Sequence, residues 1–235
     1  MQKIVRVVIS FFMIWSLSTI CEASTMDNHQ LTVKQQFIIP IAAFTAQGDM
    51  PKLKVSLIEG LDNGLTINEI KEVLVQMYAY TGFPRSLNAI GTFKQLLDER
   101  HQNGIIDVMG KEPDPLPTDK TSLQLGTEIQ TYLVGQPVSG GLMDFAPAIN
   151  QFLKAHLFGD IFGRNNIDYQ SREIATIAAL ASLGGVDSQL QSHIHMAMNI
   201  GLTHDQIREL RDILQSKVGN EQADALAQAF VNVLK

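Results

Sequence analysis

Two residues in the C-terminal third of the chain have side chains suited to acid/base chemistry. Glu173 and His193 lie between residues 172 and 212, where ionisable groups are densest on an apolar background. A carboxylate beside an imidazole fixes the tautomer of the ring and raises its basicity, so the pair can exchange protons near neutral pH. The sequence spacing makes a contact between the two side chains possible but does not guarantee it.

Each of these residues also has an ordinary structural interpretation. Glu173 suits the first turn of a helix, where the helix dipole favours negative charge, and His193 suits a hydrogen-bonded position in the core. His195 would face the opposite side of the helix from His193, so the two imidazoles are not expected to share a metal ion. No metal site and no cofactor are predicted, and His156 is a weaker candidate for chemistry.

The residues around the pair predict three consecutive helices. Apolar side chains at helical spacing indicate one buried helix over Glu173–Leu183. Gly184 and Gly185 end it, because glycine accepts the left-handed conformation that closes a helix. A second helix is predicted from about Ser188 to Ile200. A third follows Thr203, which has Gln at the capping-box spacing three residues later.

A weaker copy of this stretch lies upstream. Residues 38–49 align with 174–185 at an offset of 136, and residues 64–72 align with 201–209 at an offset of 137. The offset then holds to the end of the chain. It is far too long for a solenoid, so it predicts two copies packed as a pseudo-twofold pair.

The two copies differ at the positions that matter for chemistry. Phe37 stands where the second copy has Glu173, and Ser56 stands where it has His193. Only the second copy therefore keeps the acid/base pair. Glu72 and Glu209 occupy matching places, and both are expected to be solvated or interface charges.

A second cluster of polar residues belongs to the first copy. Gly82 and Pro84 suit a break between two helices, and proline is favoured at the first helical position. A helix N-terminus attracts anions, so Arg85 beside it is a candidate clamp for a substrate carboxylate, with Asn88 one turn further on. The alternative is a structural turn with a surface arginine and buried tyrosines, Tyr80 among them.

Three blocks of the sequence carry a family resemblance. They are R-E-I-A-T-I-A-A-L-A-S-L-G-G from Arg172, followed by H-x-x-x-A-x-x-x-G-L-T; E-I-K-E-V-L-V-Q-M-Y-A-Y-T-G-F-P-R-S-L-N-A from Glu69; and F-L-K-A-H-L-F-G-D-I-F from Phe152. Over roughly residues 36–98 and 147–235 the chain resembles the carboxymuconolactone decarboxylase family, which is related to the alkylhydroperoxidase D-like proteins. The resemblance implies an all-α fold with two internal copies of a helical hairpin unit, and homo-oligomers, often trimers or hexamers.

The resemblance also implies a chemistry. Glu173 and His193 would form a proton relay for cofactor-independent decarboxylation or isomerisation of a small carboxylated lactone or related acid. His193 would be the general acid/base and Glu173 would orient it. Arg85 or Arg172 would clamp the substrate carboxylate, and Tyr80 and Asn88 would also bind the substrate. The alternative is a non-catalytic, secreted, oligomeric binding protein, because fold does not fix function.

The cysteine content decides against one branch of the family. Thiol peroxidases of this fold use a C-x-x-C pair before the histidine, whereas residues 185–189 here read G-V-D-S-Q. The one cysteine, Cys21, lies in a segment expected to be removed. A thiol peroxidase mechanism, which needs a reactive thiolate, is therefore excluded.

Residues 1–23 are predicted to be a secretory signal peptide, cleaved after Ala23. The segment has a basic start and an apolar stretch over 7–20, which is shorter than the roughly 20 residues of a membrane span. The protein would then be periplasmic or secreted, without a stable membrane span after processing. A retained anchor and a lipoprotein modified at Cys21 are the alternatives. The formal net charge of −6 argues against nucleic acid as a partner.

The remaining chain divides by composition. A polar segment, 24–35, precedes the first copy over 36–98, and a connector rich in proline and glycine, 99–146, leads to the second copy over 147–235. Within the connector a short helix is predicted from Ser122 to Leu133. Another helix is predicted from Ala146 to Phe162.

Overall fold

The computed structural model describes residues 30–235, and every regular element in this range is a helix. The helices are α1 (Val33–Gln47), α2 (Met50–Asp62), α3 (Ile67–Gln102), α4 (Ser122–Val134), α5 (Leu142–Phe145), α6 (Pro147–Phe152), the π-helix η1 (Leu153–Ile161), α7 (Tyr169–Leu183), α8 (Asp187–Asn199), α9 (His204–Lys217) and α10 (Asn220–Val233). The predicted all-α fold is confirmed. The predicted signal peptide lies outside the described residues.

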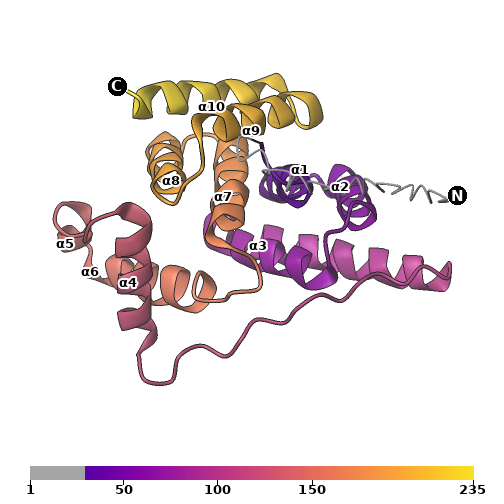
Figure 1. Ribbon diagram of the computed structural model, residues 1–235, viewed down its shortest axis with the longest axis horizontal. Helices are drawn as coiled ribbons and strands as arrows, with labels where there is room; N and C mark the ends of the chain where they lie inside the picture. Colours follow the sequence, from indigo (N-terminus) through magenta and orange to yellow (C-terminus); the bar gives the residue numbers. More distant parts are fainter. Residues whose placement is uncertain (1–29) are drawn as a thin grey trace, which may run out of the picture.

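Helices α1 and α7 pack against each other at the centre of the molecule. In Figure 1, α7 stands upright, with α1 and α2 on one side, α8 on the other, and α9 and α10 across its upper end. Ile39 and Ile41 of α1 and Ile174 and Ile177 of α7 are all fully buried in one shared core. Burying a side chain of this size contributes about 1.5–3 kcal/mol, so this contact holds the two halves of the chain together.

The upstream unit, α1 to α3, is delimited by local signals in the sequence. Thr32 caps α1 and Thr66 caps α3, each through a complete capping box. Gly82 adopts φ 79° and ψ 158°, so α3 changes direction there, as the predicted break requires. The Ser86 hydroxyl donates to the Leu74 carbonyl at 2.7 Å, which holds the two segments of α3 together across the kink.

The downstream unit, α7 to α10, follows the prediction closely but begins earlier. The predicted start was Glu173, whereas α7 begins at Tyr169 because the Asp168 side chain accepts a hydrogen bond from the Ser171 amide at 2.7 Å. The capping box at Thr203 is present, as predicted.

Leu31, in the predicted polar segment, contacts the downstream unit. Leu31 is buried, and its amide donates to the Glu209 carboxylate at 2.7 Å. The backbone directly before α1 is therefore attached to the downstream unit. Within residues 30–235, none of the helices combines the length and apolar character that a bilayer crossing requires.

The connector contains no helix between residues 103 and 121, in keeping with its proline content. It returns along α3, as Figure 1 shows, and the Val108 and Met109 carbonyls accept from the first-turn amides of Ile67 and Asn68 at 2.9 Å each. Gly110 has φ 80°, and a Cβ there would overlap the Thr66 side chain. This close approach requires glycine and fixes the connector against the start of α3.

Helices α4 and η1 cross at two glycines. A Cβ on Gly126 would overlap the backbone of Lys154, and one on Gly159 would overlap the backbone of Ser122. The predicted helix over 146–162 is present in part, but as α6 followed by the π-helix η1. Apolar periodicity could not reveal the wider winding, which is rare and often found near functional sites.

Candidate functional site

The structure brings Glu173 and His193 into direct contact. The Nδ1 atom of His193 lies 2.7 Å from Oε2 of Glu173, and both side chains are buried. Gly184 and Gly185, with φ of 70° and 72°, turn the chain so that α8 folds back onto α7. The expectation that Glu173 occupies the first turn was wrong, because α7 starts four residues earlier. The helix-dipole interpretation therefore loses its basis.

This hydrogen bond determines what the imidazole can do. With Nδ1 directed at the carboxylate, Nε2 is the nitrogen left to exchange a proton with another group. Glu173 has a second oxygen, Oε1, that is buried and makes no hydrogen bond. The pair therefore combines a proton-exchanging nitrogen with spare acceptor capacity.

Tyr80 of α3 completes the surroundings of the imidazole. Its ring meets the His193 ring edge to face, with 5.4 Å between ring centroids. The Tyr80 hydroxyl is buried beside Thr176 and makes no hydrogen bond of good geometry. Burial and the Glu173 charge raise the pKa of Tyr80, although Thr176 and Arg172 are close enough to oppose that change. The phenol therefore stays protonated and remains a hydrogen-bond donor.

A buried polar network lies directly beside the pair. Arg172 is fully buried, and its guanidinium donates to Glu72 at 2.8 Å, to Gln76 at 2.9 Å and to the Arg164 carbonyl at 2.6 Å. Burial lowers the pKa of Arg172, and the Glu72 carboxylate opposes this change. In return, the Gln76 amide donates to the Arg172 carbonyl and to Thr176 at 2.9 Å each. The network thus fixes the backbone of α7 one residue before Glu173.

Two stretches of the chain match the sequence profile of a known protein family. The sequence profile of the carboxymuconolactone decarboxylase family matches residues 16–95 and 147–231. The chain belongs to this family. It is also similar to a 4-carboxymuconolactone decarboxylase from Acinetobacter baylyi, with 28% identity over 96 residues, which cover 39% of this chain and 71% of that relative.

In this family member, the candidate arginines make their hydrogen bonds with groups other than the imidazole. Arg172 directs three hydrogen bonds into the network described above. Arg85 is exposed, and its guanidinium donates to the Ala46 carbonyl at 2.5 Å, near the end of α1. Asn88 is exposed on the same segment of α3. No hydrogen bond connects Arg85 or Asn88 with Glu173 or His193.

The expectation that Glu72 is solvated or at an interface was wrong. Its carboxylate is buried and accepts from both Arg172 and Arg164. A glutamate beside a lysine on a helix is usually a surface charge, and its partners lie about a hundred residues away, so local sequence gave no sign of burial. Gln76 and Thr176 were also missed. Each is a polar residue among apolar residues at helical spacing, and this pattern could have marked them as buried polar groups.

His195 and His156 both lie on the surface. His195 is exposed whereas His193 is buried, so the two face opposite sides of α8. His156 is exposed on η1, with Nδ1 at 2.8 Å from Asp160. Within residues 30–235, no three His, Cys, Asp or Glu side chains are grouped so that they could hold a metal ion.

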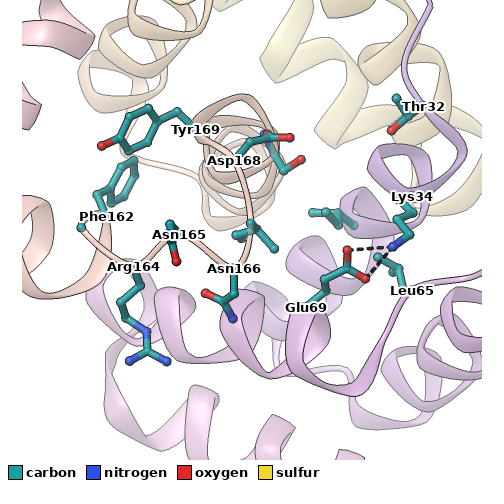
Figure 2. A pocket seen from close by; sticks show the side chains of 14 residues that line it. Thr32, Lys34, Leu65, Glu69, Phe162, Arg164, Asn165, Asn166, Asp168 and Tyr169 are labelled. Carbon is teal, nitrogen blue, oxygen red and sulfur yellow. Dashed lines mark hydrogen bonds and ion pairs between the residues drawn. The ribbon is translucent and has the colours of Figure 1, made fainter. Parts of the chain in front are cut away.

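A pocket of about 490 Å³ opens between the starts of α1 and α3 and the loop before α7. Figure 2 shows the ion pair of Lys34 with Glu69 on one side and Phe162 and Tyr169 on the other. Neither Glu173 nor His193 lines this pocket. The pocket and the acid/base pair are therefore separate features of the structure.

Proposed function

We propose that this protein is a cofactor-independent acid/base enzyme that decarboxylates or isomerises a small carboxylated lactone or a related acid. The observation that carries the proposal is the buried contact of 2.7 Å between His193 and Glu173. Burial in a low-dielectric environment strengthens the interaction between an imidazole and a carboxylate. Membership of the carboxymuconolactone decarboxylase family supports the same reaction class.

In the proposed decarboxylation, the bond between the lactone ring and its carboxylate breaks and carbon dioxide leaves. The electron pair of that bond enters the conjugated lactone as an enolate. Protonated His193 then gives its Nε2 proton to carbon, and the proton is replaced from solvent. Glu173 keeps the ring oriented through Nδ1. No electrons are exchanged with an external acceptor, so the cycle needs no redox partner.

The test is turnover of a panel of γ-lactones that carry a carboxylate, beginning with 4-carboxymuconolactone. Release of carbon dioxide and the change in lactone absorbance are measured for the wild type and for Glu173→Gln. We expect the substitution to lower the rate by about 10²- to 10⁴-fold, the usual share of general acid/base catalysis. If the wild type changes none of the lactones, the proposed reaction is rejected.

Asp160→Asn provides a matched control for that experiment. Asp160 also holds a histidine through Nδ1, at 2.8 Å, but its pair with His156 is exposed. The control removes the same kind of charge from the same kind of pair. Its turnover should equal that of the wild type.

One observation favours a second function. The pocket of about 490 Å³ is lined by Lys34, Arg164 and Asn166 and lies apart from the acid/base pair. This would suit a non-catalytic oligomeric protein that binds a small carboxylate. Binding of carboxylated lactones without turnover, abolished by Lys34→Ala but not by His193→Ala, would favour this function.

We also propose that the chain is exported after cleavage at Ala23, that it contains two copies of one helical unit and that it self-associates into a trimer or hexamer. Large apolar side chains exposed on α5 and α6, such as Phe145 at 87% and Phe152 at 62%, support self-association.

N-terminal sequencing of protein from the envelope fraction tests the cleavage. Light scattering coupled to size-exclusion chromatography tests the oligomer.

A further inference from the structure

The side chains around His193 come from both units. Glu173 and His193 come from α7 and α8, whereas the aromatic ring against His193 is Tyr80, from α3 of the upstream unit. At the offset of 137, the position that matches Tyr80 in the downstream unit is Lys217. The downstream unit therefore has the pair without its own tyrosine, and the upstream unit has the tyrosine without a pair.

We propose that Tyr80 is a catalytic residue, whose hydroxyl donates a hydrogen bond to the oxygen of the lactone as negative charge develops there. This proposal rests on the proposed function and assigns one donor at that same site. The protein then has one composite site per chain, completed only when the two units pack together.

The first argument is the bonding state of the hydroxyl. Buried polar atoms almost always have a partner, and each exception needs an explanation. The Tyr80 hydroxyl and Glu173 Oε1 are two such exceptions, and both belong to side chains beside His193. A donor and an acceptor of this kind, next to a proton-exchanging nitrogen, suit a small oxygen-rich ligand.

The second argument is the chemistry of the reaction. When carbon dioxide leaves, the electron pair of the broken bond moves onto the lactone and its oxygen becomes an enolate. A fixed neutral donor stabilises such charge without transferring its proton, and loss of one such donor costs about 10²- to 10³-fold in rate. Tyr80 keeps its proton because burial and the Glu173 charge raise its pKa. His193 remains the group that protonates carbon.

The third argument compares this site with the matching positions in the other half of the molecule. There the three corresponding residues are Phe37, Ser56 and Lys217. Lys217 reaches α2 and pairs with Glu59 at 3.1 Å, much as Tyr80 reaches α8. The packing of the third helix on the opposite unit is thus retained, while all three functional groups are absent.

The test is Tyr80→Phe, which removes the hydroxyl and keeps the ring against His193. We expect kcat for lactone turnover to fall by about 10²- to 10³-fold, with little change in KM. We also expect a thermal midpoint close to that of the wild type, because the lost hydroxyl makes no hydrogen bond of good geometry within the protein. Tyr78→Phe, two residues earlier on the same helix, is the matched control and should behave as the wild type.

Two outcomes would overturn the proposal. One is turnover within twofold of the wild type. The other is a Tyr80→Phe protein that unfolds or melts several degrees lower, because the hydroxyl would then have a structural role.

A binding measurement separates this proposal from the reaction itself. Paraconic acid, a saturated γ-lactone carboxylate, is titrated into both proteins by calorimetry. If the wild type turns over no lactone but binds paraconic acid, and Tyr80→Phe weakens that binding about tenfold, the reaction fails while Tyr80 stands as a ligand donor. When the wild type turns over no lactone, equal dissociation constants or the absence of binding to the wild type overturn the role of Tyr80.

Discussion

The upstream and downstream units have helices of matching length and differ at the positions of the proposed acid/base pair. Helices α1 and α7 both have 15 residues, and α2 and α8 both have 13. Their starts differ by the same offsets that align the sequences, 136 for Val33 and Tyr169 and 137 for Met50 and Asp187. The frame depends on apolar spacing and caps, so single polar positions are free to diverge.

A second matched pair shows how the units are joined. Arg172 of α7 donates to Glu72 of α3 at 2.8 Å, and at the corresponding positions Gln36 of α1 donates to Glu209 of α9 at 3.0 Å. Each hydrogen bond crosses from one unit to the other. The first is a fully buried ion pair, whereas the second is a half-buried bond to a neutral amide. The two hydrogen bonds therefore join matching positions of the units, but only the first joins two charged groups.

The largest effect is expected for His193→Ala. If the downstream unit alone carries the acid/base group, this substitution should abolish turnover, with a loss of at least about 10²- to 10⁴-fold. Circular dichroism and oligomer size should stay unchanged. The reverse change, Ser56→His, is the matched control and should create no second site, because Phe37 stands where a carboxylate would be needed. Undiminished turnover in His193→Ala would end the assignment of chemistry to this unit.

The next effect concerns stability and compares Glu72→Gln with Glu209→Gln. Removing one partner of a buried ion pair leaves an uncompensated charge and costs about 3–5 kcal/mol. Loss of the half-buried hydrogen bonds of Glu209 should cost only about 0.5–1.5 kcal/mol. Urea denaturation of both variants measures the difference. Equal losses would contradict the electrostatic contrast between the two contacts.

The smallest effect is expected for Glu69→Gln, which gives the upstream capping box the residue found at Gln206 in the downstream one. Burial alone would raise the pKa of Glu69, but hydrogen bonds from Lys34 and Thr66 outweigh it and hold the pKa below its ordinary 4.5. Because folding favours the ionised form, the stabilisation is present above pH 4.5 and is lost as the pH falls through the lowered pKa.

The variant should therefore be less stable than the wild type at pH 7, by no more than about 1 kcal/mol for so exposed a pair. The difference should vanish in acid. Thermal midpoints at pH 7 and at pH 3 measure it. A difference that persisted at pH 3 would show that something other than the carboxylate charge is responsible.

The sequence predicted most of the frame because helix spacing, caps and glycines act locally. The ends of α8 and the capping box at Thr203 follow from a few adjacent residues. The burial of Glu72 and the placement of Arg172 depend on partners about a hundred residues away, which one sequence does not identify. The contact of Glu173 with His193 was only partly predictable. The glycines between α7 and α8 predicted that the two helices form a hairpin, but the sequence did not show which side chains meet between them.

The connector has a consequence for assembly. Residues 103–168 join the units covalently, and the carbonyls of Val108 and Met109 bind the start of α3. Association of the units is therefore intramolecular, at an effective concentration that dilution of the protein does not change. A single chain always supplies one acid/base pair and one tyrosine, in fixed stoichiometry.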